Sequence, residues 1–301
     1  MTMLDRVGAA PISWGICEVP GWGVQLPVDR VLSEMSAMGI GATELGAIGW
    51  LPTEPIEIRD TLRAHGLGLL GGFVPLVLHD PDRIEQSRRV AETAALMMSE
   101  AGGMHFVTAV VSDPNNWQRP PLSSAEWDAL IENLADIDHL VAQYGMTQVV
   151  HPHFDTLIQT RPEIERFLED SDVSMCLDTG HLFLGEADPV AIADAYFDRI
   201  GIVHLKDVSA EIALRLRAGE LTLVAATRAG LFPALGSGDV PIEEFVNTVE
   251  SRGYSGWYVI EQDVALTDGD PPLGQGPALG VSKSVAYIRE LAATRGEHLI
   301  S

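Results

Sequence analysis

The sequence predicts an α/β fold, a (β/α)8 TIM barrel that forms a single domain over residues 1–301. Three observations predict it. Eight short apolar runs of strand length recur along the chain. Segments with the i, i+3, i+4 apolar spacing of amphipathic helices separate these runs. The chain of 301 residues has the length of one such barrel, and it contains no internal repeat or linker that would divide it.

The predicted strands are nearly continuous apolar runs, which is typical of parallel strands buried on both faces. They cover residues 9–14, 41–45, 67–74, 104–111, 147–151, 173–178, 201–206 and 257–261.

The predicted helices start and stop at residues that favour helix ends. Four apolar residues in 28–39 fall on one face, and the segment ends in a glycine stop. The helix in 124–145 has Ser124 as its cap, and the helix in 241–253 has Pro241 in its first turn. Strands that alternate with helices in this way indicate βα units.

A doubly wound sheet shows the same alternation, but it would carry a glycine-rich phosphate turn after its first strand. No G-x-G-x-x-G follows "PISWG", and "GAIGWLPTEP" after the second predicted strand lacks the pattern too. The barrel is therefore the better interpretation.

The composition excludes several classes of function. The net charge of −24 disfavours nucleic acid and anionic membranes as partners. Two cysteines, Cys17 and Cys176, do not make a disulfide framework and suggest a reducing compartment. No targeting segment is apparent, and the longest apolar stretch, from Gly66, is too short and too rich in Gly and Pro to span a bilayer. We expect a cytoplasmic protein.

Polar residues gather at the carboxyl ends of the later strands, where barrels carry their sites. His151 and Asp178 end two strands, His204 lies in the next and Glu261 ends the last, at spacings of 27, 26 and 57 residues. Nitrogen and oxygen ligands without a thiolate suit Mn, Co, Zn or Fe. We predict that these four residues bind one divalent metal ion, with Mn or Co favoured over Zn or Fe.

Each of these residues also has a plainer interpretation. A single histidine at a strand end more often makes a structural hydrogen bond. Glu44 ends the second strand and could line a sugar pocket, or it could cap the following helix. Trp14 could contact substrate, or it could belong to the core.

The motifs "CLDTGH", "VHLKD", "LGSGDV" and "GYSGWYVIEQD" occur in this order, and with them the chain resembles the xylose-isomerase-like TIM barrel superfamily of sugar isomerases and epimerases. "APISWG", "GATELG" and "HPHFDT" are most similar to its inosose dehydratase branch, which acts in inositol catabolism. The resemblance implies a divalent metal on four strand-end residues, which match His151, Asp178, His204 and Glu261 by position. The superfamily's DNA-repair endonucleases are disfavoured by the negative charge.

Many members have a glutamate where this chain has His151. In many epimerases two glutamates form the acid/base pair, so the change argues against a simple two-base epimerase. It also leaves open whether His151 or His153 faces the metal.

The resemblance implies a lyase that dehydrates a cyclic, inosose-like keto-polyol through an enediolate. Our hypothesis gives proton transfer to His153 and His181, because imidazole titrates near working pH. Lys206 would stabilise an enolate oxygen or hold a hydroxyl, with Glu261 serving catalysis as well as the metal. Trp14 and Glu44 would line the pocket for the partner, a small sugar or inositol-derived ketone.

Three other functions stay open from the sequence. They are a metal-dependent keto-sugar isomerase or epimerase, a lyase acting on a 3-keto glycoside, and a non-catalytic sugar-binding barrel. The long insertion 207–239 is expected to be either a lid that excludes water or a contact with another subunit of a homodimer or homotetramer.

Overall fold

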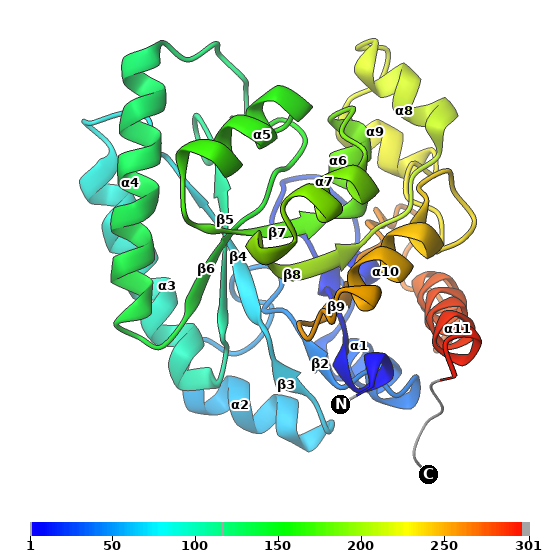
Figure 1. Cartoon of the computed structure of the whole chain (residues 1–301). Helices are drawn as coiled ribbons and strands as arrows, with labels where there is room; N and C mark the ends of the chain where they lie inside the picture. Colours follow the sequence, from blue (N-terminus) through cyan, green and yellow to red (C-terminus); the bar gives the residue numbers. More distant parts are fainter. Residues whose placement is uncertain (1, 116, 297–301) are drawn as a thin grey trace.

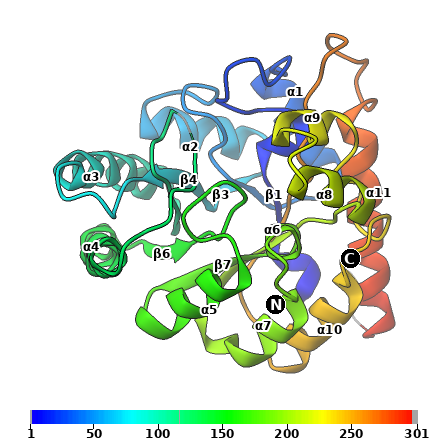
Figure 2. The ribbon, with the colours of Figure 1, turned by 90° about the horizontal axis from the view of Figure 1, so that it is seen from above.

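The computed structural model describes residues 2–115 and 117–296, so Met1, Asn116 and residues 297–301 of the predicted domain lie outside the described residues. Parallel strands form a central ring and helices surround it (Figure 1; Figure 2). The prediction of a single α/β barrel is confirmed. Among the described residues, no helix combines the length and apolar character that crossing a bilayer requires.

The strands follow one another around the ring in the order β3-β2-β1-β9-β8-β7-β6-β5-β4. Their bounds are β1 Val7–Ala9, β2 Ala42–Thr43, β3 Gly68–Leu69, β4 Gly71–Leu76, β5 His105–Val110, β6 Thr147–Val150, β7 Ser174–Asp178, β8 Ile200–Leu205 and β9 Tyr258–Ile260.

The α-helices pack outside the strands, and three short 3-10 helices lie between elements. The α-helices are α1 Val28–Ala37, α2 Pro55–Ala64, α3 Ile84–Ala101, α4 Ser124–Ala142, α5 Arg161–Asp170, α6 Thr179–Leu184, α7 Pro189–Ala195, α8 Ala210–Arg217, α9 Leu223–Arg228, α10 Ile242–Ser251 and α11 Pro277–Thr294. The 3-10 helices are η1 Met3–Arg6, η2 Pro11–Trp14 and η3 Phe197–Arg199.

The ring closes through Leu70, which separates β3 from β4 within one predicted strand. The Leu70 N–H donates to the Thr43 carbonyl, while the Leu70 carbonyl accepts from the N–H of His105. The next residue must be glycine, because a Cβ on Gly71 would lie 1.8 Å from the carbonyl oxygen of His105. The predicted strand 67–74 is thus two short strands that pair with different neighbours.

Three local predictions are wrong. Pro241 is the N-cap residue of α10 and not a residue of its first turn. The first strand covers Val7–Ala9, and Pro11–Trp14 forms η2 where a strand was predicted. Pro11 has no N–H for a strand ladder, and its fixed φ suits the first turn of a helix. The cap of α4 is Ser123, whose Oγ accepts from the Glu126 N–H, so the predicted cap is off by one residue.

A layer of apolar side chains fills the inside of the barrel. They come from the strands or from residues directly next to them. These residues form a cluster separate from the larger core between the strands and the helices. The layer consists of Ala10, Ala42, Leu70, Val107, Val149, Cys176, Ile202 and Val259. It is a solid floor beneath the carboxyl ends of the strands.

A buried ion pair lies near the amino ends of the strands, away from the predicted metal ligands at their carboxyl ends. It offers a test of whether stability and metal binding depend on separate parts of the barrel. Glu250 Oε1 accepts from Arg6 Nη2 at 2.8 Å and from the Tyr258 hydroxyl at 2.6 Å. We expect Glu250→Ala to cost about 3–5 kcal/mol, because a buried arginine would lose its counter-charge. Urea unfolding should show this loss while metal content stays unchanged. A shift below ~1 kcal/mol would contradict a structural role for the pair.

Candidate metal and active site

Strand alternation places the polar residues directly above the apolar floor. Side chains at i and i+2 of a strand face the same side. Two residues after Val149, Cys176, Ile202 and Val259 come the four residues that the sequence predicts as metal ligands. Lys206 and Asp263 follow two residues further along the chain, just beyond the ends of β8 and β9.

The four predicted ligands are brought together. One ligand atom from each of His151, Asp178, His204 and Glu261 lies within 4.8 Å of the others. All four side chains are buried. The arrangement offers two imidazole nitrogens and two carboxylates, which could hold a divalent metal ion.

The ring of His151, rather than that of His153, faces this cluster. His151 Nε2 lies 3.6 Å from Asp178 Oδ2, and its Nδ1 is 3.1 Å from the Pro152 carbonyl oxygen. A carbonyl only accepts, so Nδ1 carries the proton and the Nε2 lone pair is directed at the cluster. His153 is absent from the group of four.

Glu44 lies behind His204 and not in an open sugar pocket, so the geometry gives it a different role from the predicted one. Its Oε1 is 3.0 Å from His204 Nε2, and His204 Nδ1 is 2.6 Å from Glu261 Oε2. Burial disfavours the charged ring, but acidic neighbours raise the pKa of His204 well above its usual value. Glu44 orients the ring so that Nδ1 points at the predicted metal position.

Two atoms of the cluster lack a directional hydrogen bond, and this is what a metal site requires of them. Asp178 Oδ2 and His204 Nδ1 are both buried without such a bond. Asp178 Oδ1, by contrast, accepts from the N–H groups of Gly180 and His181 at 2.8 Å. Buried polar atoms are rarely left unsatisfied, so the residues present fit a bound cation.

A neighbouring thiol does not change the ligand chemistry. Cys176 lies close enough to His151 and His204 to form an alternative group of three. Burial raises the pKa of Cys176 to about 12. The nitrogen/oxygen set offers four ligand atoms and the group with the thiol offers three, so the nitrogen/oxygen set remains the better candidate.

Lys206 is completely buried beside the cluster. Its Nζ lies 2.8 Å from Glu261 Oε1, 2.9 Å from Asp263 Oδ1 and 3.1 Å from His181 Nε2. Burial lowers its pKa, but Asp263, Glu261 and Asp178 outweigh this and raise the pKa overall. Lys206 is therefore a fixed positive charge.

His153 and His181 lie face to face, with ring centroids 3.7 Å apart. Burial, together with the positive charge of Lys206 and neighbouring histidines, lowers the pKa of His153 to about 3 and that of His181 well below its usual value. Both rings are neutral, so the expectation that they titrate near working pH is not supported. His153 Nδ1 is 2.7 Å from the Phe154 carbonyl, which leaves its Nε2 as the acceptor.

His181 has donors near both ring nitrogens. The Phe154 N–H lies 3.2 Å from Nδ1, and the Lys206 ammonium lies 3.1 Å from Nε2. A neutral ring has one lone pair, and the charge-assisted bond is the stronger of the two. We therefore assign the lone pair to Nε2.

An aromatic wall that sequence reasoning missed borders the histidines. Phe73 of β4 and Trp117 of the β5–α4 loop stack with centroids 5.9 Å apart, and the Trp117 ring is 5.2 Å from that of His153. All three rings are half-buried, unlike the metal-ligand cluster. They mark the side on which the buried groups meet solvent. Trp117 lies in a proline-rich loop, and an aromatic residue in such a loop is the sequence signal that could have indicated this contact.

Trp14 is not brought to this wall. It is fully buried in the main core, and its indole N–H donates to Glu34 Oε2 at 2.8 Å. A ring without exposed surface has none to offer a sugar, so the core interpretation fits the structure.

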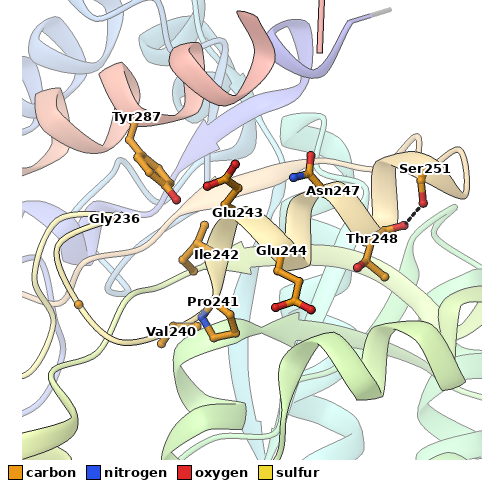
Figure 3. Close-up of a pocket in the computed structure, with 11 residues that line it drawn as sticks. Gly236, Val240, Pro241, Ile242, Glu243, Glu244, Asn247, Thr248, Ser251 and Tyr287 are labelled. Carbon is orange, nitrogen blue, oxygen red and sulfur yellow. Dashed lines mark hydrogen bonds between the residues drawn. The ribbon is translucent and has the colours of Figure 1, made fainter. Parts of the chain in front are cut away.

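An open groove of about 680 Å³ lies on a different part of the surface. Figure 3 shows it between side chains of α10, such as Glu243 and Asn247, and Tyr287 of α11. None of the strand-end residues lines it. The groove and the predicted ligand cluster are therefore separate features of the surface and the interior.

Comparison with known proteins matches this geometry. The family model described as the xylose isomerase-like TIM barrel matches residues 32–291. This chain belongs to that family. An inosose dehydratase of Geobacillus kaustophilus is 31% identical over 275 residues, which cover 87% of this chain and 89% of the relative.

More distant relatives share the family's fold. The rhizopine catabolism protein MocC of Rhizobium meliloti is 29% identical, over 87% of this chain and 82% of its own. An L-ribulose 3-epimerase structure has a TM-score of 0.72 at 16% identity, covering 96% of this chain and 95% of that one. The probable 3-DHS dehydratase AsbF from Bacillus anthracis also has a TM-score of 0.72, at 17% identity, with 94% and 98% covered.

These relatives confirm the predicted membership and the prediction of an enzyme in the lyase and isomerase group. They favour it over the non-catalytic sugar-binding barrel.

Proposed function

We propose that this enzyme is a metal-dependent lyase that removes water from a cyclic, inosose-like keto-polyol through an enediolate. One observation carries the proposal: the buried group of His151, Asp178, His204 and Glu261 occurs in a chain 31% identical to a relative named inosose dehydratase. We propose Mn or Co as the ion, because this ligand set accepts either.

The proposed reaction needs a base for the proton α to the ketone, an acid for the departing β-hydroxyl, and stabilisation of the negative charge between the two steps. A divalent ion, when bound, supplies a Lewis acid that stabilises this charge. The buried ammonium of Lys206 adds a fixed positive charge next to the same position. Glu261 orients Lys206 through Oε1 and faces His204 through Oε2.

We assign the proton transfers to His153 and His181. The Phe154 carbonyl fixes the tautomer of His153, so Nε2 has a free lone pair on the half-buried side of the cluster. His181 lies against it, and the Lys206 ammonium beside its Nε2 would supply the proton that the leaving hydroxyl needs. Their lowered pKa values keep both rings neutral before substrate binds.

We propose that the insertion 207–239 is a lid that excludes water. Its Phe232 lies 4.8 Å above the Lys206 Nζ. Arg228 donates to the carbonyls of Gly21 and Trp22, and Arg217 donates to that of Phe183. These bonds to carbonyl oxygens hold the insertion against the β1–α1 loop and against α6.

The decisive experiment incubates the purified enzyme with an inosose, with ketohexoses and with a 3-keto glycoside. Loss of one water, together with a new ultraviolet-absorbing enone or dione, supports the proposal. A product of unchanged mass would favour the isomerase or epimerase, and release of the aglycone would favour the glycoside lyase.

The aromatic wall offers a test of where substrate binds. We expect Trp117→Ala to raise KM about tenfold, which corresponds to losing ~1.4 kcal/mol of ring contact. Trp117→Phe should keep most of the affinity, because it keeps a ring beside Phe73. Stability should change by less than ~1 kcal/mol, since the side chain is half exposed on a loop. An unchanged KM in steady-state kinetics would remove the wall from the substrate site.

The cytoplasmic location and the homodimer or homotetramer stay predictions. Cell fractionation tests the first, and light scattering of the purified protein tests the second.

A further inference from the structure

The chain carries a second group of potential ligands beside the first. Ligand atoms of His181, Glu261 and Asp263 lie within 4.8 Å of one another, and all three side chains are buried. Glu261 belongs to both groups. Its Oε2 faces His204 of the first group, and its Oε1 faces Lys206. A carboxylate with one oxygen turned to each of two positions is how two-metal sites share a ligand.

The second position is filled by the Lys206 ammonium. Nζ is 2.8 Å from Glu261 Oε1, 2.9 Å from Asp263 Oδ1 and 3.1 Å from His181 Nε2, and it is 3.7 Å from Asp178 Oδ2. Asp263 Oδ1 is buried and makes no directional hydrogen bond, although the ammonium is close. The three nearest atoms, within 3.1 Å, equal in number the three N–H groups of an ammonium, and Asp178 Oδ2 lies beyond hydrogen-bond distance. The ammonium is held as a point charge.

We infer that Lys206 is a built-in replacement for a second metal ion, held by His181, Asp263 and the shared Glu261. The local charges point the same way. Lys206 places a positive charge between the carboxylates of Glu261 and Asp263, which is where a second cation would lie.

The surroundings hold the lysine in place. A Cβ on Gly180 would lie 2.6 Å from the Lys206 Cγ, so the glycine lets the stem lie against α6. Phe232 covers the ammonium from the insertion. Truncating the stem would leave room for an ion and its water ligands among residues that remain fixed.

The test measures metal stoichiometry in the full-length protein by elemental analysis and by calorimetric titration with Mn²⁺ or Co²⁺. The parent should bind one equivalent even at saturating metal. Lys206→Ala should bind about two, and its Mn²⁺ form should show the electron paramagnetic resonance signature of two coupled ions. The matched control Lys206→Met fills the space and should bind one. Lys206→Ala/Asp263→Asn, which lacks a second-position ligand, should also bind one.

One equivalent in Lys206→Ala, or two in the parent, overturns the inference. Failure of Lys206→Ala to fold in Co²⁺ as well as without it also overturns it, because the ion should replace the lost charge. The inference shares Glu261 with the proposed metal site but does not depend on the reaction. A parent that binds one ion yet dehydrates no inosose would sink the proposed function alone.

Discussion

Changing Glu261 to Gln should sharply reduce both metal binding and turnover while the protein stays folded. Glu261 lies 2.6 Å from His204 Nδ1 through Oε2 and 2.8 Å from Lys206 Nζ through Oε1. A neutral amide is a weak ligand, so we expect metal affinity to fall by at least ~100-fold. Turnover of an inosose should fall by roughly 10³-fold, the scale of losing stabilisation of a developing anion.

The fold should survive because the buried Lys206 ammonium still has the Asp263 carboxylate as a counter-charge at 2.9 Å. Elemental analysis of protein purified without chelators or a His-tag column gives the metal content, and circular dichroism checks the fold. Adding Asp178→Asn should complete the loss. The surface variant Glu244→Gln, on α10, is the matched control and should keep one equivalent. Normal turnover in Glu261→Gln would show that the site is assigned wrongly.

Removing the metal should have the second largest effect. Chelation should reduce turnover by roughly 10²-fold or more, and Mn²⁺ or Co²⁺ should restore it, because the ion would supply the Lewis acid that the proposed reaction needs. Ion at 100 times its dissociation constant stabilises the folded state by about 2.7 kcal/mol. For a chain of this size, this corresponds to a melting temperature roughly 4 °C higher.

The Asp178→Asn variant separates a specific ion from general salt effects. Its melting temperature should not respond to Mn²⁺ or Co²⁺, since the buried Oδ2 that lacks a directional hydrogen bond is then no longer a carboxylate oxygen. An equal rise in the parent and in this variant would mean that the ions act elsewhere. Full activity after chelation would refute a metal-dependent reaction.

The strand-end ligands could be predicted because barrel geometry is periodic. Once β6 to β9 are recognised, alternation puts His151, Asp178, His204 and Glu261 at one rim whatever the helices do. The first strand was predicted wrongly because its apolar composition and its proline favour different structures. "AAPISW" is as apolar as a strand, and only Pro11 signals that the backbone turns into η2.

Contacts between distant segments could not be predicted. Trp14 and Glu44 both follow early strands, yet one is sealed in the core by Glu34 and the other supports His204. Trp117 reaches His153 from a loop that has no periodic pattern. Such placements depend on side-chain packing between residues at least 20 positions apart in the chain, which no local spacing encodes.

The sequence by itself determined the barrel, the ligand types and their common rim, because strand period and parallel order leave little freedom there. Only the tertiary structure decided which histidine faces the metal position, where the charge of Lys206 lies and which pKa values move. Those properties depend on burial and on distances of about 3 Å between groups far apart in the chain, where electrostatic energies change steeply.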